Sequence, residues 1–165
     1  MQKIFVYPCS TAIGIEVGKA LKDNKHFHLE GGCSDLFFQS EDYKYINPCF
    51  FNVDIFRNPE SLVTNLVNNI DSSSLIYPAH DEVGWFLSQS RIFGDRLVMP
   101  SPETVDNCRF KSLTYQKLKD LGVPKVYTQW TDIKGGKTYF VKPNKGQGSR
   151  GARQVTAEEA ITILG

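Results

Sequence analysis

The stretch FVKPNKGQGSRGARQV, residues 140–155, places Lys142 after an apolar run and follows it with three glycines. Between residues 134 and 153 there is no acidic side chain, and six are basic: Lys134, Lys137, Lys142, Lys145, Arg150 and Arg153. Glycines let backbone N–H groups approach an anion without a Cβ in the way, and successive amides form an anion-binding concavity. An ammonium about 4 Å from a phosphate charge contributes roughly 4 kcal/mol at an effective dielectric constant near 20, before desolvation is subtracted. The stretch therefore predicts a site for an anionic ligand such as a polyphosphate.

The surroundings of the glycines distinguish between several kinds of phosphate loop. GQGSRG, residues 146–151, matches G-x-G-x-x-G, but a dinucleotide loop leads directly into a helix, and ARQV at 152–155 is typical of a strand. In a protein kinase the lysine follows the loop, whereas Lys142 precedes it. The Gly-Lys-Ser/Thr of a P-loop is absent. The pattern favours a flexible flap between two strands. A plain solvated hairpin loop is the alternative, because glycine and lysine are common in turns.

Residues 1–99 alternate between strand and helix patterns. Four short apolar runs are typical of strands: 3–7, 27–32, 74–78 and 96–99. Helices between successive strands imply right-handed crossovers, so we expect an α/β fold with a Rossmann-like, doubly wound parallel sheet. The turn after the first strand contains only Gly14, so the glycine triplet of a nicotinamide dinucleotide site is missing.

Two helices are predicted from apolar spacing in this first part. The first has its stripe at Ile13, Val17, Ala20 and Leu21. The second begins at Asn58 and Pro59, a capping residue followed by proline. Its stripe consists of Leu62, Val63, Leu66, Val67 and Ile70. The second stripe is expected to face a core.

A third helix is predicted over 83–90, ended by Gly94. Asp81 is expected to cap it. His80 and Glu82 share the same place, at the carboxyl edge of the sheet, where open α/β folds bind ligands. Contact with a substrate is the alternative role for these three residues.

The second part, residues 100–165, starts with a helix at Ser101 and Pro102 and keeps a helical pattern up to Gly122. Strands are expected at 126–130, 137–143 and 152–155. Thr156 and Glu159 form a capping box that opens a last helix. These residues are few for a separate domain, so we expect an incomplete α+β subdomain.

Composition narrows the class of protein. Apolar residues make up 41% of the chain and charged residues 22%, typical of a globular protein, and the net charge of +1 gives no overall case for nucleic acid. No apolar run is long enough to cross a bilayer, so we expect a cytoplasmic protein without a membrane partner. The four cysteines form no C-x-x-C pair and no histidine stands at ligand spacing, which predicts reduced thiols and no metal bound through histidine.

Two segments together resemble a known family. FVKP followed by NKGQGSRGARQV is similar to the lysine-bearing strand and glycine-rich flap of ATP-grasp enzymes, and residues 101–124 resemble the segment that opens their ATP-grasp domain. The resemblance is to carboxylate-amine ligases related to the large subunit of carbamoyl phosphate synthetase and to biotin carboxylase. It implies that residues 1–99 form the Rossmann-like pre-ATP-grasp domain. Residues 100–165 are then the beginning of the ATP-grasp domain.

The resemblance also implies roles for particular residues. Lys142 corresponds to the lysine that contacts the α- and β-phosphates of ATP, and Lys111 to the lysine of the opening helix that also reaches the nucleotide. The family often has Cys-Arg-Asp-Lys where this chain has Phe110 before Lys111, so the pattern around Lys142 is matched more fully. The flap that closes over the phosphates comprises Lys145, Gly146, Gly148, Ser149, Arg150 and Gly151.

The implied reaction is ligation through an acyl phosphate, formed from a small carboxylate and ATP and then attacked by an amine or a thiol. Mg²⁺ is the implied metal, and its acidic ligands are expected beyond residue 165. The chain is then the N-terminal part of a larger enzyme, inactive alone, with a homodimer as one option for its assembly. The alternative is a Rossmann-like module that binds a small ligand or regulates without catalysis.

Overall fold

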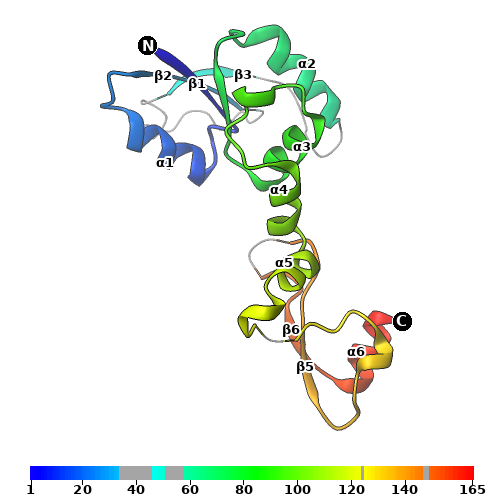
Figure 1. The fold of residues 1–165 in the computed structure, drawn as a ribbon. Helices are drawn as coiled ribbons and strands as arrows, with labels where there is room; N and C mark the ends of the chain where they lie inside the picture. Colours follow the sequence, from blue (N-terminus) through cyan, green and yellow to red (C-terminus); the bar gives the residue numbers. More distant parts are fainter. Residues whose placement is uncertain (34–45, 51–57, 124, 147–148) are drawn as a thin grey trace. The chain divides into compact units, whose positions relative to one another are not determined.

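The computed structural model describes residues 1–33, 46–50, 58–123, 125–146 and 149–165, and Figure 1 shows their helices and strands. The chain divides into two compact units, Met1–Val105 and Asp106–Gly165, which we call unit 1 and unit 2. The division falls within helix α4, Pro102–Arg109. None of the described helices is long and apolar enough to cross a membrane.

Unit 1 is built on a parallel sheet. Four strands are described: β1 Gln2–Tyr7, β2 Phe27–Cys33, β3 Asn47–Phe50 and β4 Leu75–Pro78. They lie in the order β3-β2-β1-β4, and each neighbouring pair runs parallel. The predicted α/β class is confirmed, because parallel strands alternate with helices. The strand expected at 96–99 is reduced to one parallel bridge between Leu97 and Ile76, since residues 94–96 are wound into a 3₁₀ turn.

Helices pack on both faces of this sheet (Figure 1). They are α1 Ala12–Leu21, α2 Pro59–Asn69 and α3 Asp81–Ser90. Side chains alternate along β1: Phe5 and Tyr7 join the apolar cluster formed with α2 and α3, and Ile4 and Val6 join the cluster on the α1 side. A strand that is buried on both faces explains why the KIFVY segment is continuously apolar.

The predicted apolar stripes are only partly correct. In α2, Leu62 and Leu66 are fully buried as expected, but Val67 is 54% exposed. In α1 the buried positions are Gly14 and Gly18, whereas Ile13 is 49% exposed. A Cβ on Gly14 would lie 2.7 Å from the Cys9 carbonyl oxygen. The helix therefore packs through its glycines, because a larger side chain would push it away from the chain that follows β1.

The start of α3 differs from the prediction. His80, not Asp81, is the N-cap, and its Nδ1 accepts a hydrogen bond from the Glu82 backbone N–H at 3.2 Å. Asp81 is instead the first residue of the helix, where its charge is favourable at the positive end of the helix dipole. The helix ends at Ser90, as predicted, but the residue that ends it is Arg91, in the left-handed region at φ 55°, and not Gly94.

Unit 2 combines short helices with one hairpin. Its elements beyond α4 are α5 Lys111–Lys117, η3 Lys119–Leu121, η4 Trp130–Asp132, β5 Thr138–Val141, β6 Arg153–Thr156 and α6 Ala157–Leu164. The expected helix up to Gly122 is interrupted at Phe110, which has extended backbone. No strand forms at 126–130, where the chain instead enters the 3₁₀ helix η4. The capping box of Thr156 and Glu159 at the start of α6 is confirmed.

Candidate anion-binding site

The glycine-rich loop connects two antiparallel strands, as predicted. β5 and β6 pair from Thr138 opposite Thr156 to Val141 opposite Arg153, so the loop begins at Lys142, directly where β5 ends. Gly151 has φ 75°, and a Cβ there would lie 3.0 Å from Cγ of Pro143. Glycine is therefore required at this position both by backbone conformation and by the proline opposite it.

Lys142 contacts the first helix of unit 2. Its Nζ donates a hydrogen bond to the Tyr115 hydroxyl at 2.7 Å and lies 4.5 Å from the centroid of the same ring. The side chain is solvent-exposed, and an ammonium carries three N–H donors. One donor is directed to Tyr115, so two remain for an anion.

Lys111, at the start of α5, contacts the same loop. Its backbone N–H donates to the carbonyl oxygen of Asn144 at 3.1 Å, and its Nζ donates to the carbonyl oxygen of Gly146 at 3.2 Å. The backbone N–H of Ser112 donates to Oδ1 of Asn144 at 2.9 Å. Phe110, the N-cap residue of α5, makes no side-chain cap. Asn144 therefore supplies the cap from the loop and fixes the base of the loop to the helix.

The other predicted residues lie further along the loop. Lys145 Nζ is 4.9 Å from the centroid of the Phe110 ring, a cation–π distance. Ser149, at φ 58°, Arg150 and Gly151 are exposed at the far part of the loop. Gly148 lies outside the described residues. The structure thus brings Lys111 and Lys145 to the start of α5, and Lys142 to Tyr115, one turn further along the same helix.

Charge is divided unequally between the two units. Unit 2 contains eleven Lys and Arg residues against five Asp and Glu, whereas unit 1 contains eight against thirteen. The net charge of +1 for the whole chain therefore conceals a strongly basic unit 2. A locally positive unit attracts anions even in a chain that is neutral overall.

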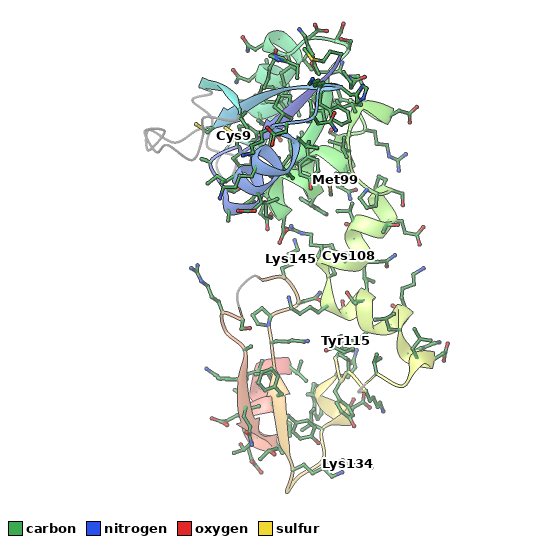
Figure 2. All side chains as sticks on the ribbon, turned by 90° about the vertical axis from the view of Figure 1, so that its left-hand side faces the viewer. Cys9, Met99, Cys108, Tyr115, Lys134 and Lys145 are labelled. Atoms are coloured by element: carbon green, nitrogen blue, oxygen red, sulfur yellow. The ribbon has the colours of Figure 1, made fainter. Side chains whose placement is uncertain are left out.

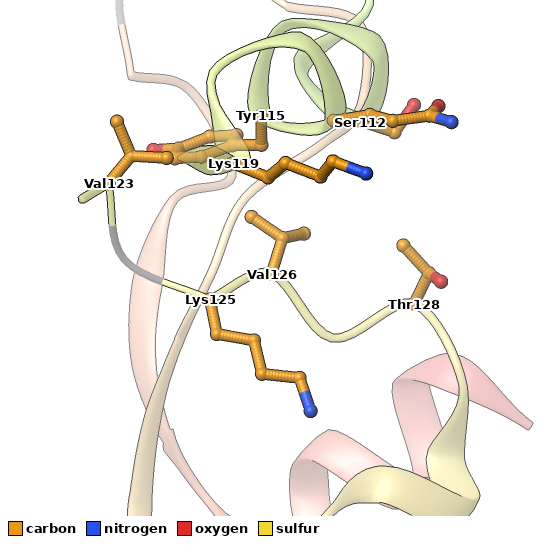
Figure 3. A pocket seen from close by; sticks show the side chains of 8 residues that line it. Ser112, Tyr115, Lys119, Val123, Lys125, Val126 and Thr128 are labelled. Atoms are coloured by element: carbon orange, nitrogen blue, oxygen red, sulfur yellow. The ribbon is translucent and has the colours of Figure 1, made fainter. Parts of the chain in front are cut away.

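A pocket of about 520 Å³ lies beside α5, and Figure 3 shows most of its lining. Its walls come from α5, η3 and the segment that follows: Ser112, Tyr115, Gln116, Lys119, Val123, Lys125, Val126 and Thr128. Tyr115 belongs both to this pocket and to the contact with Lys142. The spacing of four residues between Lys111 and Tyr115 places the two on one helix face.

Residues that could hold Mg²⁺ do not gather in the described part of the chain. No group of three or more His, Cys, Asp or Glu side chains there has the arrangement of a metal site. Residues 134–153 contain no carboxylate at all. The cationic side chains fit phosphate oxygens, and the donor set does not fit a magnesium ion.

Two loops at the carboxyl edge of the sheet in unit 1 are joined by a local contact. Oγ1 of Thr11, the N-cap of α1, lies 2.8 Å from the carbonyl oxygen of Ala79 and 3.1 Å from that of Pro8. It also accepts a hydrogen bond from the Gly14 N–H at 3.0 Å. These contacts join the loops that follow β1 and β4.

No family model matches the chain, and no curated protein matches it.

Proposed function

We propose that this chain carries part of the ATP phosphate-binding site of an ATP-dependent carboxylate-amine or carboxylate-thiol ligase of the ATP-grasp type. In this proposal unit 1 corresponds to the Rossmann-like pre-ATP-grasp domain and unit 2 to the beginning of the ATP-grasp domain. The proposal is supported by the resemblance of the two sequence segments and by the cationic surroundings of the loop.

One observation carries the proposal. Lys111 and Lys142 are 31 positions apart in the sequence, yet each makes a hydrogen bond between α5 and the loop, at helix positions one turn apart. Two ammonium groups at one loop, with glycine backbone beside them, suit an extended polyphosphate better than a single carboxylate.

The reaction proposed for the whole enzyme passes through an acyl phosphate. The residues of this chain would bind and orient the phosphates and offset their charge, which is the main protein contribution to phosphoryl transfer. No step is assigned to magnesium, because its ligands are not found among the described residues and are expected beyond residue 165. The chain alone is therefore expected to bind nucleotide without turning it over.

Binding of a non-hydrolysable ATP analogue to the 165-residue chain tests the proposal. Lys142→Ala is expected to weaken the affinity at least tenfold, because it removes a charge-assisted hydrogen bond worth about 1.5–3 kcal/mol. Lys134→Ala is the matched control: Figure 2 shows Lys134 at the opposite end of unit 2 from Lys145, and the affinity should stay within twofold. Equal affinities for the wild type and Lys142→Ala would overturn the proposal.

A second measurement addresses the inactivity of the chain. We expect no phosphate release from ATP by the purified chain. Steady release that Lys142→Ala abolishes would show that catalysis does not need further residues. The alternative of a non-catalytic ligand module predicts binding in unit 1, at the carboxyl edge of the sheet. Nucleotide affinity that survives Lys142→Ala would favour that alternative.

A further inference from the structure

Two buried cysteines lie at the carboxyl edge of the sheet in unit 1. Cys9 follows β1, and Cys33 is the last residue of β2. Both side chains are fully buried, and both belong to the apolar cluster on the α1 side of the sheet. Both are thiols in the structure. Two nucleophilic groups that are 24 positions apart in the sequence are thus brought to one face of the sheet.

The hydrogen bonds between β1 and β2 place the two cysteines opposite each other. Gln2 lies opposite Phe27, and its N–H donates to the carbonyl oxygen of the residue before Phe27. In the same way the Cys9 N–H donates to the carbonyl oxygen of Gly32, the residue before Cys33, at 2.9 Å. Neighbouring strands lie about 5 Å apart, and the two Cα atoms of a disulfide are usually about 4.4–6.8 Å apart. The backbone therefore holds the two cysteines at a separation that a disulfide can span.

Glycine at position 31 makes room for the Cys9 side chain. A Cβ on Gly31 would lie 2.7 Å from Cβ and 3.0 Å from Sγ of Cys9. Gly31 and Cys33 are two residues apart in β2, so they face the same side of the sheet. The Cys9 sulfur therefore lies over the row of β2 positions that ends at Cys33.

We propose that Cys9 and Cys33 are a redox pair that forms a reversible disulfide. The oxidant is a low-molecular-weight disulfide, such as oxidised glutathione. One protein thiolate attacks this disulfide, which releases one small thiolate and leaves a mixed disulfide on the protein. The other protein thiolate then attacks the protein sulfur of the mixed disulfide and releases the second small thiolate. The two protons of the protein thiols pass to the two small thiolates, so one small disulfide is reduced to two thiols.

Burial governs how the pair reacts. A buried thiol reacts only when the surrounding chain opens locally, so the reaction is slow. Once one thiol has formed the mixed disulfide, the second is already held beside it, which favours the internal disulfide. Cys108 is exposed in α4 and reacts without such opening, so it is expected to form a mixed disulfide first. The pair lies outside the glycine-rich loop and does not depend on the function proposed for that loop.

Peptide mapping of the 165-residue chain by mass spectrometry tests the proposal. The folded chain is equilibrated with oxidised and reduced glutathione at a series of ratios, and the remaining thiols are blocked with iodoacetamide. Trypsin places the four cysteines in four different peptides, so every link can be assigned. We expect a peptide pair that joins Cys9 to Cys33, with a mass about 2 Da below the sum of the two thiol peptides, and dithiothreitol should separate it. The linked chain should also unfold at a higher temperature than the reduced chain, because the link constrains the unfolded state.

Variants separate this pair from the other two cysteines. Cys9→Ala and Cys33→Ala are each expected to abolish the link, and Cys108→Ala is the control that should keep it. Cys49 lies opposite Gly32 in β3, so it is the competing partner. The proposal is overturned if both thiols stay reduced while Cys108 forms a mixed disulfide, if Cys9 links to Cys49 instead, or if the link forms only in urea. The peptide map of the wild-type chain decides the question even where a variant does not fold.

Discussion

The hydroxyl group of Tyr115 accepts a hydrogen bond from Nζ of Lys142 at 2.7 Å, across a sequence separation of 27 residues. The contact joins α5 to the end of β5. A lysine side chain has about 2 kcal/mol of rotamer entropy to lose when it is held in place. Tyr115 therefore limits the positions of Lys142 before any ligand arrives.

Tyr115→Phe is expected to weaken binding of a non-hydrolysable ATP analogue about three- to tenfold. The ring remains, but the hydrogen bond that orients the ammonium is lost, and immobilising a lysine costs about 0.5–1.5 kcal/mol on binding. Isothermal titration calorimetry gives the affinity. The loss should be smaller than that in Lys142→Ala. Unchanged or tighter binding would mean that the hydroxyl does not orient the lysine for the ligand.

Asn144→Ala is expected to lower the free energy of unfolding of unit 2 by about 1 kcal/mol, as for loss of a helix cap. The variant removes the acceptor of the Ser112 N–H bond, which is one of the contacts between α5 and the base of the loop. Urea unfolding and amide hydrogen exchange at Ser112 measure the effect. Asn144→Asp, which keeps an oxygen acceptor, is the control and should protect the Ser112 amide. Equal exchange in both variants would argue against the cap.

Gly14→Ala is expected to destabilise unit 1 by about 1–3 kcal/mol, because overpacking forces the helix to shift. A Cβ at Gly14 would lie 2.7 and 2.8 Å from backbone atoms of Cys9, which cannot rotate away. Gly84→Ala, in α3, is the matched control: its Cβ would meet only the flexible end of Met99 at 2.8 Å. The helix propensity of alanine offsets that contact by about 1 kcal/mol. Thermal unfolding measures the loss of stability in each of the two variants. Equal losses in Gly14→Ala and Gly84→Ala would contradict this prediction.

Asp71→Asn is expected to lower stability near neutral pH, with a difference that disappears in acid. Lys3 Nζ lies 2.9 Å from Oδ2 of Asp71, and this hydrogen bond, followed by that from the Ser73 N–H, holds the pKa of Asp71 below its usual range. Because the pKa of Asp71 is lower in the folded than in the unfolded state, its ionised form stabilises the fold at pH values above the unfolded-state pKa of about 4. This stabilisation is lost as the pH falls through the folded-state pKa.

Urea unfolding of the wild type and Asp71→Asn at a series of pH values checks this prediction. The two midpoints should differ by a constant amount between about pH 5 and pH 9 and converge below about pH 4. Asn keeps an acceptor for the Ser73 N–H, so the comparison isolates the charge. Both side chains are more than a third exposed, so the effect is small and should shrink with added salt. Midpoints that converge in alkali instead would refute it.

Features set by neighbouring residues could be predicted from the sequence. The start of α2 at Asn58 and the capping box of Thr156 and Glu159 are local hydrogen-bonding patterns, and both are correct. The strand at 126–130 was wrong because β-branched and aromatic residues favour a strand only where a partner strand is present. The N-cap of α3 was predicted at Asp81 but is His80, since its position depends on where the chain turns after β4.

The charged residues of the candidate site could be predicted from the sequence, but the contacts that they make could not. The position of Lys142 at a strand end follows from the apolar run before it. The partnership with Tyr115 and the cap from Asn144 join residues 27 and 32 positions apart, and no local pattern reports such distances. The pocket was missed for the same reason.

The separation of acidic residues in unit 1 from basic residues in unit 2 should govern the behaviour of the protein in solution. At low ionic strength, the acidic unit 1 of one molecule should attract the basic unit 2 of another. We therefore expect turbidity near the isoelectric point, and retention of the protein on both anion- and cation-exchange resins. At 0.15 M salt the screening length falls to about 8 Å, and this mutual attraction between molecules should fade.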